Sequence, residues 1–135
     1  MAELTIEIVT PTGVLYSGSC TSCTAPGAEG QFQILEGHAA LMANLEIGEM
    51  RIEDSGKEKH LATSGGFLEV KDNFIAIVAE SAEFADKIDI ERAKEAEKRA
   101  RERLEKSEEH DIDVQRAQLA LARAINRIKI SSRHL

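Results

Sequence analysis

The feature that most constrains this chain is an abrupt change of sequence pattern at Ile88. Before this point, apolar and polar residues alternate in short runs that glycine and proline interrupt. From Ile88 onward neither glycine nor proline occurs, and alanine and charged residues recur at helical spacing. Asp89 is predicted to cap the first helix, because a carboxylate there can accept hydrogen bonds from the otherwise unpaired amides of the first turn. The pattern therefore predicts a β-domain over residues 1–87 followed by a helical domain over residues 88–135.

The first part of the chain has the alternation and turn signals of short strands. Asp54-Ser55-Gly56 and Asp72-Asn73 are predicted to be hairpin turns, and Gly65-Gly66 is predicted to separate two strands. Because no helical pattern intervenes, the sequence predicts an antiparallel β-sandwich or barrel. Strands are expected at residues 4–9, 14–24, 32–35, 49–53, 59–63, 67–70 and 74–79.

The second part is predicted to form two helices, one from Ile90 to Ser107 and one that Asp113 caps, with residues 108–112 as the connection. Each helix has a thin apolar stripe at three- and four-residue spacing, which predicts an antiparallel αα-hairpin and an α+β fold overall. An alanine-rich seam removes little apolar area from water compared with a leucine seam. The helices are therefore expected to be persistent but weakly joined. The sequence leaves open whether the hairpin opens or stays closed.

The two cysteines, Cys20 and Cys23, are compatible with half a zinc site, a redox pair or two reduced thiols. Within one strand from residue 14 to 24 they would point to opposite faces, which disfavours a disulfide. The four histidines are scattered singly, so no metal site is expected. Two reduced thiols in a sheet and no redox cofactor are the prediction.

Charge is unevenly distributed along the chain. Residues 1–88 contain 14 acidic and 5 basic side chains, whereas residues 89–135 contain 10 acidic and 12 basic ones. An acidic body with a cationic tail does not favour nucleic-acid binding, which needs a basic footprint on a folded surface. The N-terminus lacks the pattern of a secretory signal, and the longest apolar run is too short to cross a bilayer. We therefore expect a cytoplasmic protein without direct membrane insertion.

No nucleophile–base pair is evident in the first part, so an enzyme is not expected. His38 lies in a predicted connection, where a histidine can be catalytic, but no cysteine, serine or carboxylate is spaced to act with it. Packing or hydrogen bonding is the expected role of His38. The glycine-rich residues 27–30 lack the lysine and the following helix of a phosphate-binding loop, and a turn is predicted there.

Arginine spacing is the sharper functional clue. Arg116, Arg123 and Arg127 follow steps of seven and four residues along the second helix, and Arg92 and Arg99 are seven residues apart on the first. Each set projects from one helix face. If the hairpin closes, the two lines could converge on one anion, since the guanidinium group suits phosphate oxygens. A solvated charged face is the alternative that the spacing leaves open.

Three motifs in order give the chain a resemblance to the epsilon subunits of bacterial F-type ATP synthases over essentially its full length. Residues 30–41 are similar to the signature G-x-F-G-I-L-x-G-H-x-P-L and depart from it at Gln33 and Ala40. Residues 64–70, Ser-Gly-Gly-Phe-Leu-Glu-Val, match a second signature. Residues 88–93 fit the [I/L]-D-x-x-R-A motif that marks ATP-binding members of that family.

The resemblance implies a non-catalytic subunit of the central stalk, on the cytoplasmic face of the cell membrane. Its β-sandwich would contact the gamma subunit and the ring of c subunits, with Glu29 and His38 at the rotor contact. Its hairpin would be compact in one state, and in another would extend to the alpha/beta catalytic head and restrain ATP hydrolysis. The runner-up is a stand-alone ATP-sensing or scaffold module with a static hairpin.

The resemblance also implies ATP as a regulatory ligand of the compact state, with or without magnesium. Arg92, Arg99, Arg123 and Arg127 would meet the phosphates. Ile88, Asp89 and Ala93 would surround the base, and Glu83 is added from the flanking sequence. A further hypothesis, motivated by the basic tail, is that Arg116, Arg123 and Arg127 meet acidic groups of the catalytic head when ATP is scarce.

Overall fold

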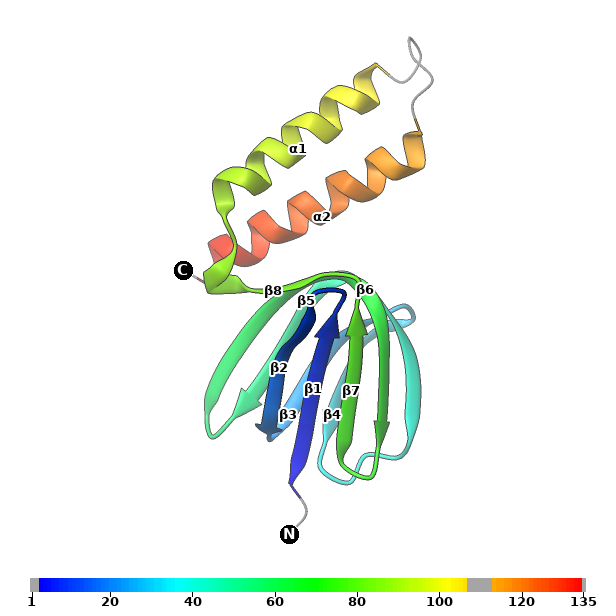
Figure 1. Ribbon diagram of the computed structural model, residues 1–135, viewed down its shortest axis with the longest axis vertical. Coiled ribbons are helices and arrows are strands. Elements are labelled where there is room, and N and C mark those ends of the chain that lie inside the picture. Colours follow the sequence, from blue (N-terminus) through cyan, green and yellow to red (C-terminus); the bar gives the residue numbers. More distant parts are fainter. Residues whose placement is uncertain (1–2, 107–112, 135) are drawn as a thin grey trace. The chain divides into compact units, whose positions relative to one another are not determined.

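The computed structural model describes residues 3–106 and 113–134 (Figure 1). The chain divides into two compact units, Met1–Phe84 and Ala85–Leu135. Each unit is described by itself below. The first is a β-sandwich and the second is a pair of helices, so the predicted fold class is confirmed.

The first unit contains eight strands. Its sheet runs in the order β2-β1-β7-β6-β5-β3-β4, with the short β8 also paired to β6. The strands are β1 (Leu4–Thr10), β2 (Gly13–Cys20), β3 (Ser22–Gly27), β4 (Gly30–Leu35), β5 (Leu41–Asp54), β6 (Lys57–Lys71), β7 (Phe74–Ala79) and β8 (Ala82–Phe84).

Most neighbouring strands are antiparallel, but β1 and β7 are parallel, with Ile6 beside Ile75 and Ile8 beside Ile77. The predicted antiparallel sandwich is therefore confirmed, with one parallel pair that the sequence analysis did not anticipate. This pairing joins strands that are far apart in the chain, and a local alternation of apolar residues contains no signal for it. It places β1 and β7 side by side in Figure 1.

Residues 14–24 do not form a single strand, contrary to the prediction. The chain leaves β2 at Cys20 and enters β3 at Ser22, and Thr21 between them bonds through both its amide and its hydroxyl to the carbonyl of Glu53. Cys20 and Cys23 consequently belong to different strands and are both buried in the same core. The predicted reduced thiols are present as free cysteines, but the argument that they point to opposite faces was wrong.

Gly65 and Gly66 lie inside the 15-residue strand β6 and do not end it, which corrects the predicted break. Their φ angles of 115° and 148° are accessible to glycine but strained for other residues. A Cβ on Gly66 would lie 2.2 Å from the carbonyl oxygen of Val78. The glycine pair thus lets one strand change direction and continue pairing with β5 and β7.

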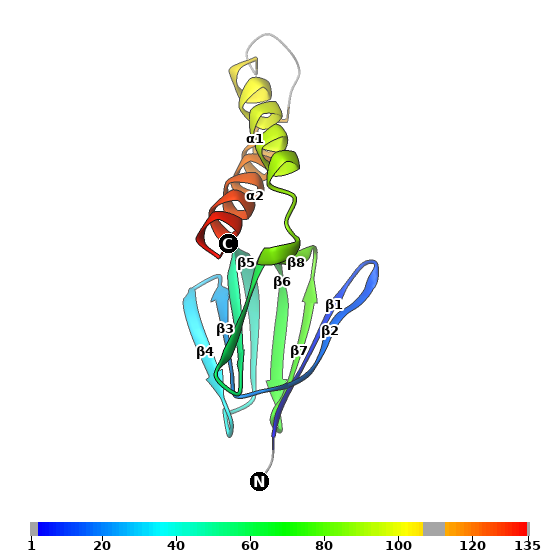
Figure 2. The ribbon, with the colours of Figure 1, turned by 90° about the vertical axis from the view of Figure 1, so that its left-hand side faces the viewer.

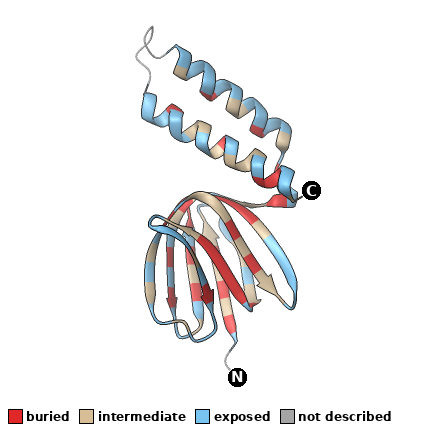
Figure 3. Ribbon diagram, turned by 180° about the vertical axis from the view of Figure 1, so that it is seen from behind, coloured by how far each residue is buried: buried red, intermediate tan, exposed pale blue. Residues whose placement is uncertain are grey.

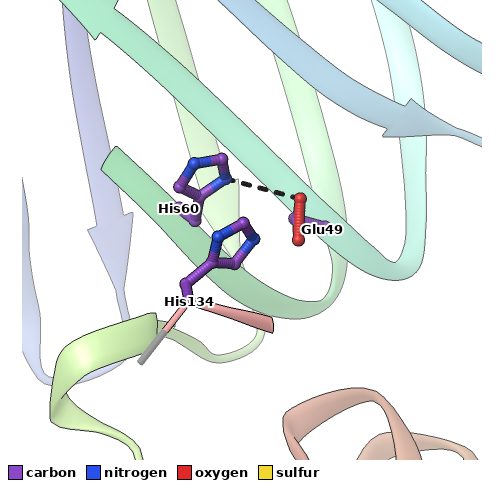
Figure 4. A group of neighbouring side chains, drawn as sticks. All are labelled: Glu49, His60 and His134. Atoms are coloured by element: carbon purple, nitrogen blue, oxygen red, sulfur yellow. Dashed lines mark ion pairs between the residues drawn. The ribbon is translucent and has the colours of Figure 1, made fainter. Parts of the chain in front are cut away.

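The hairpin turns at residues 54–56 and 72–73 are confirmed. The turn residues Ser55, Asp72 and Asn73 have positive φ angles between 52° and 61°, in the left-handed region that tight turns use. Near the first of these turns, Nδ1 of His60 in β6 lies 3.4 Å from Oε1 of Glu49 (Figure 4). Nε2 of the same ring lies 3.2 Å from Oε2 of Glu58.

The core of the first unit is made of large aliphatic side chains that alternate along the strands, as Figure 3 shows for the buried positions. Burying such side chains contributes about 1.5–3 kcal/mol each relative to exposure. The largest fully buried side chains of this core are Leu4, Ile6, Ile8, Ile34, Met50, Ile52, Leu61, Leu68, Val70, Ile75 and Ile77.

The second unit begins with a 3₁₀ turn, η1 (Ala85–Lys87), followed by α1 (Ile90–Glu105) and α2 (Val114–Arg133). Both predicted N-caps are confirmed, because Asp89 accepts from the amide of Arg92 at 3.2 Å and Asp113 accepts from the amide of Arg116 at 3.0 Å. The first helix ends at Glu105, two residues before the predicted Ser107. The predicted connection at 108–112 lies outside the described residues.

The two helices pack against each other as the predicted antiparallel hairpin (Figures 1 and 2). Four alanines are buried, Ala93 and Ala100 on α1 and Ala117 and Ala124 on α2. The spacing is seven residues on both helices, so the two pairs can meet in antiparallel order. The seam between the helices is therefore lined by small side chains, as the sequence predicted. No described helix is long and apolar enough to cross a membrane.

Candidate anion-binding site on the helical hairpin

The candidate site is built on the seam alanines, because an arginine precedes each of them. Arg92 and Arg99 precede the two alanines of α1, and Arg116 and Arg123 precede the two alanines of α2. Successive residues of an α-helix are rotated by about 100°, so each arginine lies at the edge of the seam. The packing of the alanines therefore decides which arginines come to the same level of the hairpin.

When Ala93 lies level with Ala124, two arginines of α2, Arg123 and Arg127, come level with the first turn of α1. They then lie on either side of the level of Arg92, within about 3 Å of it along the hairpin axis, given a rise of 1.5 Å per residue. These three arginines are called the proximal triad below. This register would bring together three of the four arginines predicted to contact phosphate.

Arg99 is separated from Arg92 by seven residues, or about 10 Å along α1. In the register that sets Ala93 level with Ala124, Ala100 is level with Ala117, and Arg116 then lies near the level of Arg99. In that register Arg99 is the predicted phosphate contact farthest from the others.

The proximal triad combines one exposed and two half-buried side chains. Arg92 is exposed, whereas Arg123 and Arg127 are half-buried, and Nε of Arg123 is inaccessible to solvent. A partly buried guanidinium interacts with an anion more strongly than a fully solvated one, because the local dielectric constant is lower. The chemistry of the triad suits a multiply charged oxyanion such as a phosphate chain.

The residues predicted to surround a base have structural roles in the closed hairpin. Asp89 caps α1 through Oδ1, and Ala93 is fully buried in the seam. Ile88 is 9% exposed and lies between η1 and α1, with its amide bonded to the carbonyl of Ala85 at 3.4 Å. Glu83 is half-buried and belongs to β8 of the first unit.

The residues predicted at the rotor contact are both on the sandwich. Glu29 is exposed in the turn between β3 and β4, beside a cavity of about 500 Å³ that Phe32 and Met42 also line. His38 lies in the connection between β4 and β5, where Nδ1 is 2.6 Å from the carbonyl oxygen of Ala39. His38 therefore has a hydrogen-bonding role in the structure, as expected from the sequence.

An exposed apolar row on the sandwich was missed by the sequence reasoning. Val14 is 61% exposed, Val78 is 59% exposed and Phe67 is 36% exposed. Val9 of β1 is paired with Val14 of β2 on one side and with Val78 of β7 on the other. Val78 is in turn paired with Phe67 of β6, so the row crosses four adjacent strands. The signal was present in residues 74–79, where both alternating sets are apolar and one of them must face outward.

Burial makes the two cysteines poor nucleophiles. Desolvation raises the pKa of Cys20 to about 11, with a smaller contribution from Asp54. Desolvation, with a smaller contribution from Cys20, raises the pKa of Cys23 to about 12. Both thiols are therefore protonated at neutral pH, and the thiolate that nucleophilic or metal-binding chemistry requires is disfavoured.

Both units match known protein families. Residues 3–85 match the family described as "ATP synthase, Delta/Epsilon chain, beta-sandwich domain", and residues 86–132 match "ATP synthase, Delta/Epsilon chain, long alpha-helix domain". The chain is 48% identical to the ATP synthase epsilon chain of Desulforamulus reducens, covering 92% of this chain and 93% of that one. It is 46% identical to the epsilon chain of Syntrophomonas wolfei, with full coverage of both.

Solved structures share the fold at low sequence identity. A chain in the cryo-EM structure of the Euglena gracilis mitochondrial ATP synthase, OSCP/F1/c-ring, is similar with a TM-score of 0.76 and 23% identity, covering 99% of this chain and 83% of that one. A chain in the central stalk/c-ring structure from Tetrahymena thermophila is similar with a TM-score of 0.62 and 16% identity, with coverage of 98% and 96%. The sandwich and the hairpin therefore recur together in these structures.

Proposed function

Because the chain belongs to the delta/epsilon family of ATP synthase subunits and matches epsilon chains over its full length, we propose that it is a non-catalytic, regulatory subunit of the central stalk. The sandwich attaches it to the rotor, and the hairpin regulates ATP hydrolysis. Its place is the cytoplasmic face of the cell membrane, which it reaches through the complex. The observation that carries the proposal is the match of both units in order to one subunit family.

Two surfaces of the sandwich support docking on the rotor. The row Val14, Val78 and Phe67 exposes apolar side chains across four strands, and a partner that covers it would remove that area from water. The cavity beside Glu29 has a second exposed apolar side chain, Met42, which is 64% exposed. We assign the gamma subunit and the c-ring as the partners of these surfaces, with Glu29 and His38 at the contact.

The alanine seam supports a hairpin that opens. Each buried alanine removes far less apolar area from water than a buried leucine, which contributes about 1.5–3 kcal/mol. Each helix also has its own N-cap, Asp89 for α1 and Asp113 for α2, so it has local support that does not depend on the seam. In the proposal, the helices separate while staying helical, and the extended form reaches the catalytic head.

ATP is proposed as the ligand that favours the closed hairpin. The proximal triad fits a phosphate chain, since it supplies three guanidinium groups from two helices at one level. Arg99 lies farther along α1 as an additional phosphate contact. A ligand that binds only the closed form stabilises it by RT ln(1 + [L]/Kd), which is about 2.7 kcal/mol at a hundredfold excess over Kd. The remaining proposed ATP contacts are Ile88, Asp89, Ala93 and Glu83.

Inhibition is proposed to use the same helix in its extended state. Helix α2 carries five basic and no acidic side chains between Val114 and Arg133. Without ATP, Arg116, Arg123 and Arg127 would be available to acidic groups of the alpha/beta head. Replacing these three arginines by glutamine is expected to raise ATP hydrolysis by the reconstituted complex. Unchanged hydrolysis would contradict the inhibitory contact.

Calorimetric titration of the full chain with ATP, with and without magnesium, tests the ligand. Arg92→Gln/Arg127→Gln removes two charges of the proximal triad and is expected to weaken ATP binding at least tenfold, since each charge-assisted hydrogen bond contributes about 1.5–3 kcal/mol. The matched control is Lys98→Gln/Lys129→Gln, which also removes one exposed charge from each helix but away from the seam. Equal weakening in both variants would reject the proximal triad as the ATP site.

The alternative, a module with a static hairpin, is favoured by one observation, the packing of α1 along α2. Hydrolysis by a complex whose hairpin carries a crosslink between the two helices distinguishes an opening hairpin from a static one. Opening predicts that the crosslink relieves inhibition of hydrolysis in the complex, whereas a static hairpin predicts no change.

A further inference from the structure

The two helices of the hairpin are copies of one sequence pattern. Shifting residues 88–103 by 24 positions aligns them with residues 112–127, and eight of the sixteen positions are identical. The motif of isoleucine and aspartate followed by Arg-Ala thus occurs twice, at residues 88–93 and at residues 112–117. The identical pairs are Ile88/Ile112, Asp89/Asp113, Arg92/Arg116, Ala93/Ala117, Ala96/Ala120, Arg99/Arg123, Ala100/Ala124 and Arg103/Arg127.

The described residues of the two copies also match in structure. Asp89 and Asp113 both cap their helices by accepting from the amide three residues later, at 3.2 and 3.0 Å. The seam alanines of the two copies, Ala93 and Ala100 in the first and Ala117 and Ala124 in the second, are all between 0% and 3% exposed. An antiparallel pair of equivalent helices has an approximate twofold axis perpendicular to the hairpin plane. The caps and the seam alanines near one end therefore have counterparts near the other, whereas the arginines differ in burial, because Arg99 and Arg103 are exposed and their counterparts Arg123 and Arg127 are half-buried.

The approximate twofold axis relates each arginine of the proximal triad to an equivalent arginine of the other helix, which gives a second set of three. Arg92 corresponds to Arg116, Arg123 corresponds to Arg99, and Arg127 corresponds to Arg103. We call Arg99, Arg103 and Arg116 the distal triad. Arg116 comes level with the α1 segment between Arg99 and Arg103 when the seam alanines face each other. The three levels span about 6 Å, as in the proximal triad.

Both triads project from the same face of the hairpin. The arginines within each helix are seven and eleven residues from the first one, close to two and three full turns, so they form one line. On both helices the seam alanine follows its arginine by one residue, so the arginine line lies on the same rotational side of the seam. The centres of the two triads are about 13 Å apart along the hairpin.

Packing of the seam explains why alanine recurs, but it does not explain why arginine recurs beside it. The second copy has one acidic and three basic residues where the first has five acidic and six basic ones, so its net charge is +2 instead of +1 and the arginines of the repeat are its only basic residues. The ion pairs of α1, Lys94–Glu91 at 4.0 Å and Arg101–Glu97 at 3.9 Å, use cations that lie off the arginine line.

We propose that the distal triad is a second anion-binding site, which takes an oligophosphate at the end of the hairpin opposite the proximal triad. The ligand class follows from three guanidinium groups within reach of one multiply charged anion. The ligand bridges α1 and α2 and adds its binding free energy to the closed hairpin. This proposal rests on the internal repeat and shares Arg99 with the proposed ATP site, whereas Arg103 and Arg116 are outside that site, so it does not require that site to bind ATP.

The test is a calorimetric titration with inorganic tripolyphosphate of full-length chains that already contain Arg92→Gln/Arg127→Gln, so that the proximal triad keeps only one of its three charges. Adding Arg103→Gln/Arg116→Gln is expected to weaken the remaining binding at least tenfold. The matched addition is Lys98→Gln/Lys129→Gln, which gives the same net charge and is expected to weaken it less than threefold. Glutamine is a good helix former, and far-UV circular dichroism checks that helix content is kept.

Equal weakening in the two quadruple variants overturns the proposal, because only net charge would then matter. A parallel titration with ATP distinguishes the sources of phosphate. Similar affinity for ATP and tripolyphosphate in the Arg92→Gln/Arg127→Gln chain is expected, and binding of ATP without tripolyphosphate overturns the assignment to phosphate. If Arg92→Gln/Arg127→Gln binds ATP as tightly as the wild-type chain does, the proposed proximal site is wrong. The comparison of the two quadruple variants still tests the distal site in that case.

Discussion

The sandwich and the hairpin bury different side chains, and this difference separates attachment from regulation. The sandwich core consists mainly of isoleucine, leucine, valine and methionine side chains from β1, β4, β5, β6 and β7, to which β2 and β3 add cysteine and alanine. The helices of the hairpin bury four alanines together with Ile130 and Ser131 near the end of α2. Hydrophobic stabilisation scales with the apolar area removed from water. The sandwich is therefore expected to hold a fixed shape, whereas the hairpin is closed by a weak contact, so a ligand that binds only the closed form can shift its opening equilibrium.

The largest expected effect comes from truncating the sandwich core. Leu68 is fully buried on β6, and Leu68→Ala is expected to lower the free energy of unfolding by about 2–5 kcal/mol, because it removes transfer free energy and leaves a cavity. Urea denaturation followed by circular dichroism measures this loss. Val78→Ala, at a position that is 59% exposed on the neighbouring β7, is the control and should change stability by less than about 0.5 kcal/mol.

The same comparison applies to the hairpin seam. Ala100 is 3% exposed, but Ala100→Gly removes one methyl group and is expected to cost about 1 kcal/mol, mostly through helix propensity. A loss as large as that of Leu68→Ala would contradict the weak seam on which the opening hairpin depends.

A backbone change in the sandwich is expected to have the next largest effect. Gly66→Ala places a Cβ 2.2 Å from the carbonyl oxygen of Val78 at a φ angle of 148°, so the strand must shift. Gly56→Ala is the matched control, since Gly56 also has a positive φ of 80° but has nothing within 4 Å of its Cβ position. The control is expected to lose about 1 kcal/mol from backbone strain, and Gly66→Ala should lose clearly more. Similar midpoints of thermal unfolding for the two variants would show that the bend in β6 tolerates a side chain.

In the hairpin, the cap of α2 tests whether each helix is supported locally. Asp113→Ala removes the bond to the amide of Arg116 and is expected to destabilise α2 by about 1 kcal/mol. Hydrogen exchange should accelerate in the first turn of α2 and remain unchanged in the strands. Asp113→Asn, which keeps an acceptor at the same position, should restore most of the protection. Faster exchange throughout the sandwich would indicate that the two units unfold together.

The sequence was sufficient where the structure depends on neighbouring residues. The caps Asp89 and Asp113 followed from a carboxylate before an apolar-periodic segment, and the turn at Asp54-Ser55-Gly56 followed from its residue types. The long strand β6 was not predicted, because Gly65-Gly66 is normally a break. Its continuation depends on pairing with β5 and β7, which lie elsewhere in the chain.

For the candidate site, the spacing of the arginines was evident in the sequence, but their grouping was not. The seven-residue spacing predicts that Arg99 and Arg92 lie on the same face of α1. With Ala100 level with Ala117, Arg99 lies instead near the level of Arg116. Only the antiparallel seam decides which arginines share a ligand, and a one-turn shift of α2 would regroup them. The 24-residue repeat is readable in the sequence, but its meaning depends on the matching caps and buried alanines of the two helices.

The smallest expected effect is the pH dependence of the two thiols in the sandwich core. Burial raises the pKa of Cys20 to about 11 and that of Cys23 to about 12, so the folded state binds more protons than the unfolded state once the pH exceeds the ordinary thiol pKa. The thiols thus stabilise the fold below about pH 8.5, and this contribution is lost as the pH rises toward the raised values.

Unfolding titrations of wild type and Cys20→Ala/Cys23→Ala between pH 7 and 10.5 measure this pH-dependent loss of stability. The wild type should lose stability more steeply with pH than the variant, and parallel curves would mean that solvent reaches the thiols. The hairpin has no cysteine, so its hydrogen exchange, corrected for the intrinsic pH dependence, should be the same in both chains.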